Sequence, residues 1–223
     1  DEGSTPLGSV AVKASINGGA QRNVTAAANG TFTLPMPDPG PGSVLTVWLN
    51  TNGGSTGTTV TRTNGGGITG LDIYQNRLVA SHEDGGPLSN ANIGLCDKTS
   101  GTVCTDSDLH FDESSGNLTV DNDWRLYIDN DKTFTPGGAV TLSPGGTAAS
   151  VGGDLKFGSS GSTLNVSTNA VNVGGDWINT AGGTFTKLTG QTVTMTGTVP
   201  GLIVESSSRN FERLPFNGSC GAW

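Results

Sequence analysis

The strongest constraint on the fold is a short phrase that recurs at a fixed distance along the chain. Val-Gly-Gly-Asp followed by an apolar residue occurs at 151–155 and returns at 173–177, 22 residues later, and a looser echo spans 120–128. A repeat of this length is typical of coils that stack on one another, with apolar side chains inward and glycines at the corners. The spacing therefore predicts that Val151 and Val173 occupy equivalent places in successive coils.

The rest of the C-terminal half has the same character, because short β-rich runs alternate there with glycine-containing turns. Asp154 and Asp176 recur with the phrase, and Asp123 stands in the echo. We expect these carboxylates to cap turns, since short polar side chains bond readily to nearby main-chain amides. The sequence predicts a β-solenoid-like repeat region over 116–223, with a second β-sandwich as the alternative.

The N-terminal part alternates with the period of a half-buried strand. Val10, Val12 and Ala14 fall on one face of a run that ends in an Asn-Gly-Gly turn, and residues 31–36 predict a further strand. The run 43–51 is apolar on both faces, which predicts a central strand. The whole chain is predicted to be all-β, with an immunoglobulin-like sandwich over 1–75 and a connector of strand and loop over 76–115.

Composition excludes several classes of function. The net charge is −8 with 11 Lys and Arg, so nothing could neutralise a run of phosphates, and nucleic-acid binding is not expected. No apolar run reaches the roughly 20 residues of a membrane span. Charged residues are only 13% of the chain, and Thr, Ser, Asn and Gly replace them, which favours an exported protein. Because no signal peptide opens the chain, we expect a processed form or a segment of a longer polypeptide.

Three cysteines allow one short bridge. Cys96 and Cys104 are eight residues apart with Gly101 between them, a spacing that predicts a disulfide closing a β-hairpin. Zinc is not expected, because His82 and His110 show no ligand-like spacing. Cys220 is left over, either as a buried free thiol or as a link to another chain.

Two acidic clusters are the candidate ligand sites. Calcium binds carboxylate and carbonyl oxygens on flexible loops, although neither cluster matches an EF-hand. The alternative is that these aspartates are solvated turn residues, and no other cofactor is expected. Catalysis is not expected either, since no Ser-His-Asp order and no zinc-protease motif occurs. The calcium candidates are Asp106, Asp108, Asp112, Asp121, Asp123, Asp129 and Asp131.

Two stretches resemble known families. Residues 23–49, with Gly30, Phe32 and Leu34, resemble carboxypeptidase-regulatory-like (prealbumin-like) β-sandwich modules of secreted and surface proteins. Such modules usually begin with one more strand, so the resemblance implies an open sheet edge here. Residues 173–197 and 211–223 resemble the repeats of large bacterial surface proteins and filamentous-haemagglutinin-type adhesins, with Cys220 where that pattern has glycine.

These features together predict an extracellular, non-enzymatic structural protein: a subunit or repeat segment of a surface filament, sheath or giant adhesin. We expect copies of the chain to join head to tail by β-strand addition. The alternative is a carbohydrate-binding or polysaccharide-degrading surface module, with glycans or the cell envelope as partners. The residues expected at the junction are Val10, Val12, Phe211, Leu214, Phe216, Cys220 and Trp223.

Overall fold

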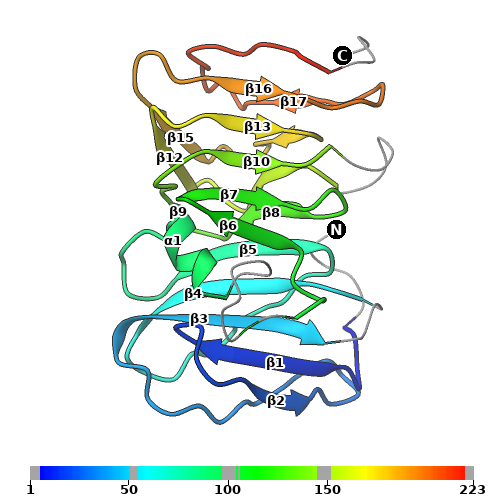
Figure 1. The fold of residues 1–223 in the computed structure, drawn as a ribbon, viewed down its shortest axis with the longest axis vertical. Helices are drawn as coiled ribbons and strands as arrows, with labels where there is room; N and C mark the ends of the chain where they lie inside the picture. Colours follow the sequence, from blue (N-terminus) through cyan, green and yellow to red (C-terminus); the bar gives the residue numbers. More distant parts are fainter. Residues whose placement is uncertain (1–5, 51–54, 97–103, 105, 145–151, 219–223) are drawn as a thin grey trace.

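The computed structural model describes residues 6–50, 55–96, 104, 106–144 and 152–218. Within these ranges the chain is all-β, as predicted, and its strands lie in three sheets. Figure 1 shows the strands as successive rungs of a stack, with β2 at one end and β16 near the other. No helix in the described ranges has the length and apolar character that crossing a membrane requires.

The longest sheet has nine strands in the described part of the chain and runs the length of the stack. Its strands from β17 to β4 are parallel to one another, whereas β4, β3, β1 and β2 pair antiparallel. From one edge to the other the strands are β17 (Val204–Glu205), β14 (Trp177–Ile178), β11 (Leu155–Phe157), β8 (Arg125–Ile128), β5 (Arg77–His82), β4 (Thr58–Asn64), β3 (Pro41–Asn50), β1 (Ala11–Ile16) and β2 (Arg22–Thr25).

Two smaller sheets form the other sides of the stack. Their strands are parallel except for β6, which is antiparallel to β7. The second sheet contains β16 (Val193–Met195), β13 (Val171–Val173), β10 (Val140–Leu142), β7 (Asn117–Val120) and β6 (Phe111–Ser114). The third sheet contains β15 (Thr184–Lys187), β12 (Thr163–Ser167) and β9 (Thr133–Phe134).

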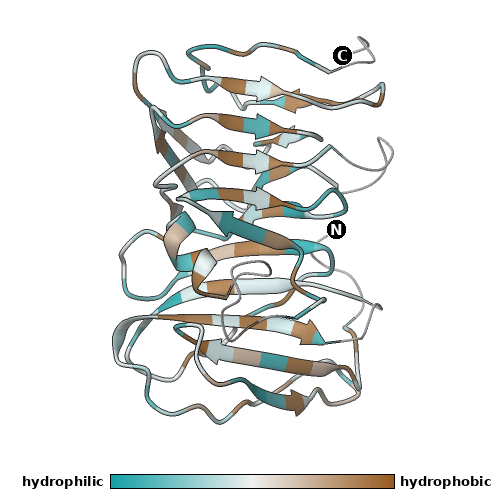
Figure 2. Ribbon diagram, in the orientation of Figure 1, coloured by the Kyte–Doolittle hydropathy of each residue, from teal (hydrophilic) through white to brown (hydrophobic). Residues whose placement is uncertain are grey.

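From β7 onward the chain visits the three sheets in turn, so each circuit is one coil that lies on the previous one. The inward side chains form ladders, and Figure 2 shows apolar residues at matching places on the stacked strands. Each fully buried side chain of this size contributes about 1.5–3 kcal/mol. The ladders are Leu118, Val140, Val171 and Val193; Leu126, Leu155 and Trp177; and Phe134, Leu164 and Phe185.

The 22-residue spacing is the register of the ladder in three strand pairs: Leu118 pairs with Val140, Leu155 with Trp177, and Val171 with Val193. Val173, however, pairs with Leu142 and Met195. Its predicted counterpart, Val151, lies outside the described residues. Twelve residues separate β10 from β11, whereas three separate β13 from β14, so an insertion precedes the repeated phrase in one coil.

The four N-terminal strands lie in one sheet, which corrects the predicted sandwich of two facing sheets over 1–75. Strand β3 is buried on both faces, as predicted. Val44 and Trp48 face the long core of the coils, while Val47 and Leu49 belong to a second cluster on the outer face of the sheet. Alternation along the sequence identifies a half-buried strand, but it does not identify what covers the strand.

The outer cluster is covered by irregular backbone instead of strands. Phe32, Leu34 and Met36 pack against the cluster, yet residues 31–40 contain no strand. Proline explains the failed prediction, because prolines at 35, 37 and 39 have no N–H to give to a ladder.

The predicted boundary at residue 75 is crossed by main-chain pairing. Strands β4 and β5 are parallel neighbours, with Thr58 opposite Leu78 and Val60 opposite Ala80. Val60 and Leu78 also share the long core. The N-terminal strands therefore continue the sheet of the coils. A loop-rich composition indicates where the topology changes, but it does not indicate that a separate core begins there.

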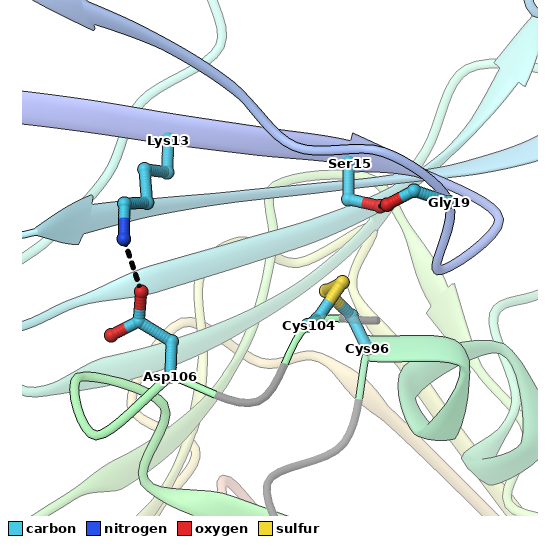
Figure 3. The surroundings of a disulfide bond; sticks show 6 residues. All are labelled: Lys13, Ser15, Gly19, Cys96, Cys104 and Asp106. Carbon is cyan, nitrogen blue, oxygen red and sulfur yellow. Dashed lines mark hydrogen bonds and ion pairs between the residues drawn. A yellow bond between two sulfur atoms is a disulfide. The ribbon is translucent and has the colours of Figure 1, made fainter. Parts of the chain in front are cut away.

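A short helical segment packs beside the long core, against β4 and β6. It consists of α1 (Asn90–Ile93), whose N-cap Ser89 forms a capping box with Asn92, followed by the 3-10 helix η1 (Gly94–Cys96). Cys96 is bonded to Cys104, and both are fully buried in the core (Figure 3). The predicted disulfide is thus confirmed, but Cys96 ends a helix where a hairpin strand was expected.

We expect loss of this disulfide to lower the free energy of unfolding by about 2–3 kcal/mol, because the bond restricts a short loop in the unfolded chain. The comparison is between the wild type and the double variant Cys96→Ala with Cys104→Ala, by urea unfolding followed by circular dichroism. Cys220→Ala is the matched control, since it leaves the bonded pair intact. A non-reduced digest that finds both cysteines as free thiols would contradict the bond.

Candidate functional site

A large hollow lies on the outer face of the N-terminal sheet. Its floor is formed by outward side chains of β1 and β3, among them Val12 and Val47, and by Val10 just before β1. Its other walls are the irregular segments 29–39 and 65–77, which contribute Leu34 and further apolar side chains. The volume is about 1600 Å³, and its lining is more apolar than polar. Two of the predicted junction residues, Val10 and Val12, therefore line a cavity.

The edge expected beside these valines belongs to another strand. Strand β1 is paired on both sides, to β2 and to β3, so its main chain is not at a sheet edge. Strand β2 is the edge strand, and Asn23 and Thr25 are exposed on it. This corrects the position of the open edge, because the sequence shows which runs are strands and leaves their order in the sheet open.

The C-terminal junction residues lie at the opposite end of the stack. Phe211 packs edge-on against Trp177 with 5.0 Å between ring centroids, and Leu214 is half-buried against the same core. Phe216 is 47% exposed and pairs with Met195. The structure does not bring these residues together with Val10 and Val12, and Cys220 and Trp223 lie outside the described residues.

The segment that carries these residues already pairs with β16. The N–H groups of Val193 and Met195 donate to the carbonyls of Arg213 and Pro215, at 3.0 and 2.9 Å, and the N–H of Asn217 donates to Met195 at 2.8 Å. Residues 213–217 therefore lie on β16 as the start of a further coil.

The repeated aspartates bond to the next coil. The N–H of Asp176 donates to Oδ1 of Asp154 at 2.8 Å, and the N–H of Ile203 donates to Oδ1 of Asp176 at 2.8 Å. Gly153, just before the first aspartate, has φ +80°, and a Cβ there would lie 2.7 Å from the carbonyl oxygen of Ser143. Only glycine fits this corner. The two carboxylates thus connect successive coils, whereas caps of their own turns were expected.

The partner of Asp154 is Arg125, a residue that the repeated phrase does not indicate. Arg125, and not Asp123, lies opposite Asp154 in the ladder, and its Nε and Nη2 donate to Oδ2 at 3.2 and 2.8 Å. Both side chains are buried. Burial raises the pKa of Asp176, and the nearby carboxylates of Asp154 and Glu205 raise it further. The signal available in the sequence was an arginine inside an apolar run, at 124–128.

The first group of calcium candidates is engaged in contacts within the chain. The ammonium of Lys13 donates to Asp106 at 2.6 Å (Figure 3). The N–H of Asp108 donates to the same carboxylate. Burial opposes ionisation of Asp106, but these bonds outweigh it and hold its pKa below the usual value. Asp106 thereby connects β1 to the segment that follows Cys104, and Asp112 lies on β6.

The second group is dispersed. Asp121 and Asp123 lie 3.5 and 3.7 Å from Nδ1 of His110, whose ring stacks on Trp124. Asp129 accepts the N–H of Asn130, and Asp131 accepts the hydroxyl of Ser159. Within the described ranges, no group of three or more His, Cys, Asp or Glu residues has an arrangement that could hold a metal ion.

A smaller polar hollow of about 240 Å³ lies on the outer face of the long sheet. Tyr74, Asp129 and Asn130 line it, and across it Lys132 forms an ion pair with Glu83 at 3.1 Å. An aromatic ring beside carboxylates and an amide is a combination that could hold a sugar.

His82 is a buried polar group at the end of β5. Its Nε2 accepts the N–H of Thr133 at 2.8 Å, so the ring is neutral with its proton on Nδ1. Burial lowers the pKa of His82, and the charge of Lys132 lowers it further. Protonation of Nε2 would break this bond between β5 and β9.

We expect stability to fall as the pH drops below about 6.5, the unperturbed value for histidine. The pKa of His82 is lower in the folded chain than in the unfolded chain, so below that pH the unfolded chain binds more protons. The contribution is complete above the unfolded pKa and is lost as the pH falls through the folded pKa. Urea unfolding between pH 5 and 7.5 measures it.

The variant His82→Gln separates this effect from other titrations, because a glutamine oxygen can accept the Thr133 N–H and does not titrate. We expect a flatter pH dependence for His82→Gln than for the wild type. Equal slopes for the wild type and His82→Gln would show that another group is responsible.

Compared with known proteins, the chain matches no family model, no curated protein and no solved structure. The resemblances to prealbumin-like modules and to adhesin repeats therefore stay predictions.

Proposed function

We propose that the chain is a β-solenoid-like structural unit of an extracellular filament, sheath or giant adhesin, and that units join head to tail by β-strand addition. One observation carries this proposal: β2 and β17 are the two edges of the nine-stranded sheet, at opposite ends of the stack (Figure 1). Edge strands present unpaired main-chain groups that can accept another strand. A contact between unlike ends need not close, so it propagates into a fibre.

The chemistry of the chain supports an extracellular place for this unit. The Cys96–Cys104 disulfide is of the kind that persists in oxidising compartments. Charged residues make up only 13% of the chain. A polar surface with little charge weakens repulsion between copies, which favours close assembly.

The test measures association of the chain with itself. Small-angle scattering over a concentration series is expected to give a mass that rises with concentration for the wild type. The double variant Asn23→Lys with Thr25→Lys places two charges on the edge strand and is expected to stay monomeric. Thr119→Lys with Thr194→Lys is the matched control, because it adds the same charge to the second sheet.

A second variant examines the other end of the stack. A chain truncated before Asn210 loses the segment that lies on β16, and we expect it to associate less than the wild type. Circular dichroism confirms that it retains its strands. If the wild type stays monomeric at high concentration with a well-formed β signal, the head-to-tail model is wrong.

Carbohydrate recognition is the second candidate, and the polar hollow beside Tyr74 and Asp129 is the observation in its favour. A glycan array with a calcium titration tests it. Saturable sugar binding that is lost in Asp129→Ala and kept in Asp112→Ala would replace the purely structural function.

A further inference from the structure

The cavity on the outer face of the N-terminal sheet is large for a small-molecule site. Its volume is about 1600 Å³, whereas pockets for drug-sized ligands measure about 300–1,000 Å³. Asp38, Asp72 and Arg77 are the charged residues among those that line it. The occupant that fits is therefore larger than a drug-sized ligand and mostly apolar over the part that enters.

The floor of the cavity has the side-chain pattern that receives a strand. Val12, Val47 and Leu49 are buried and point outward from adjacent antiparallel strands, and Val10 and Leu45 are half-buried beside them. Alternate residues of a strand point to the same side. A second strand could therefore lie over this face with every other side chain directed into it.

The wall formed by residues 32–38 has main-chain groups available for pairing. In the described part of the chain, these residues make no hydrogen bond to another backbone group. Leu34 and Met36 precede prolines, which restricts both to extended backbone. In extended backbone the N–H and C=O of Leu34 and Met36 point to one side, and the carbonyls of Pro35 and Pro37, which have no N–H, point to the other. One side of the segment 32–38 can therefore form hydrogen bonds with another strand, whereas the prolines prevent regular pairing on the other side.

The opposite wall has the same property. Residues 67–73 contain no strand, and within the described ranges their backbone makes no hydrogen bond to another main-chain group. Leu71 and Ile73 pack against the apolar floor. The Asp72 carbonyl accepts the hydroxyl of Thr59, and within the described ranges the main-chain groups of 32–38 and 67–73 have no main-chain partner. An added strand could form hydrogen bonds with these groups, which a small apolar molecule in the hollow could not do.

We propose that this cavity is an acceptor slot for an extended β-strand of another polypeptide, with apolar side chains at alternate positions and no charge in the segment that enters. The proposal rests on the proposed function for the use of strand addition, and it places that addition on the face of the N-terminal sheet as well as at the edges. Main-chain bonds to residues 32–38 or 67–73 would supply affinity, and the apolar floor would select the side chains.

The test is a titration of the full chain with a capped, fluorescein-labelled peptide that alternates Val and Thr over seven positions between soluble Gly-Lys ends. Fluorescence anisotropy is expected to show saturable binding. A peptide with proline at the central position is expected to bind at least about tenfold weaker, because proline cannot complete the main-chain bonds. Equal affinity of the two peptides would overturn the proposal.

Two further measurements separate a strand site from an apolar hollow. Leu34→Ser is expected to weaken peptide binding by about tenfold or more, since it replaces an apolar wall group with a hydroxyl. Leu188→Ser, on an exposed residue of a distant coil, is expected to leave binding unchanged. Hydrogen exchange is expected to slow at amides within 32–38 or 67–73 when the peptide binds. Binding of decanoate with no binding of the alternating peptide, or peptide binding without slower exchange, would overturn the proposal.

The titration uses protein at a concentration where scattering finds only monomers. Failure of the peptide to bind would therefore contradict the acceptor slot, and it would not bear on head-to-tail assembly through the sheet edges. Conversely, peptide binding by a chain that never associates with itself would support the slot and contradict self-assembly.

Discussion

Replacing Asp154 with asparagine is expected to lower the free energy of unfolding by about 3–5 kcal/mol, because it removes the carboxylate from a buried ion pair. Nη2 of Arg125 lies 2.8 Å from Oδ2 of Asp154, and the side chains are 10% and 2% exposed. Asparagine can still accept the N–H of Asp176, so the variant removes the negative charge and keeps this hydrogen bond. Urea unfolding at pH 7 measures the loss.

Two further variants test this explanation. Asp176→Asn keeps an acceptor for Ile203 and removes a carboxylate whose pKa is raised by burial and by Asp154, so we expect it to be at least as stable as the wild type. The double variant Arg125→Met with Asp154→Asn removes both charges and is expected to recover most of the loss. Equal destabilisation by Asp154→Asn and Asp176→Asn would instead assign the effect to the hydrogen bonds between coils.

The stacked coils could be predicted because their signal is local. The pairing of Leu155 with Trp177 follows directly from the 22-residue recurrence, since each coil repeats the previous one. The disulfide could also be predicted from the local sequence, because the short separation makes Cys104 the obvious partner of Cys96.

Register within the repeats could not be predicted from the echo at 120–128. The echo aligns Asp123 with Asp154, whereas the ladder places Arg125 there. Similar residue types two positions apart also share a face, so periodicity alone cannot separate the two alignments. The ion pair between Arg125 and Asp154 depends on the pairing of β8 with β11, which the sequence pattern does not specify.

The apolar cavity could not be predicted either, because its walls are two irregular segments that do not pair with a neighbouring strand. Residues 32–38 alternate in the manner of a strand, but they lack a neighbouring strand in the sheet. Pairing is a property of segments distant in sequence, and a single run of residues does not specify it.

Replacing Trp177 with alanine is expected to have the other large effect, a loss of about 3–5 kcal/mol in the free energy of unfolding. Trp177 is fully buried and contacts three aromatic rings, those of Phe157, Phe185 and Phe211, at centroid distances of 5.7, 5.0 and 5.0 Å. Alanine would leave a cavity among side chains from three coils. Trp177→Phe retains most of the volume and is expected to lose less.

Trp177→Ala is also expected to destabilise only one part of the chain. Each coil contacts only its neighbours, so loss of Trp177 should loosen the coils from β13 onward and spare the strands that precede them. We expect hydrogen exchange of Trp177→Ala to be faster over 193–217 and unchanged over 44–49 and 118–128. Leu188→Ala, on a side chain that is 57% exposed, is the control and should change neither region. Uniformly faster exchange along the chain would instead mean that the coils and the N-terminal sheet unfold as one cooperative unit.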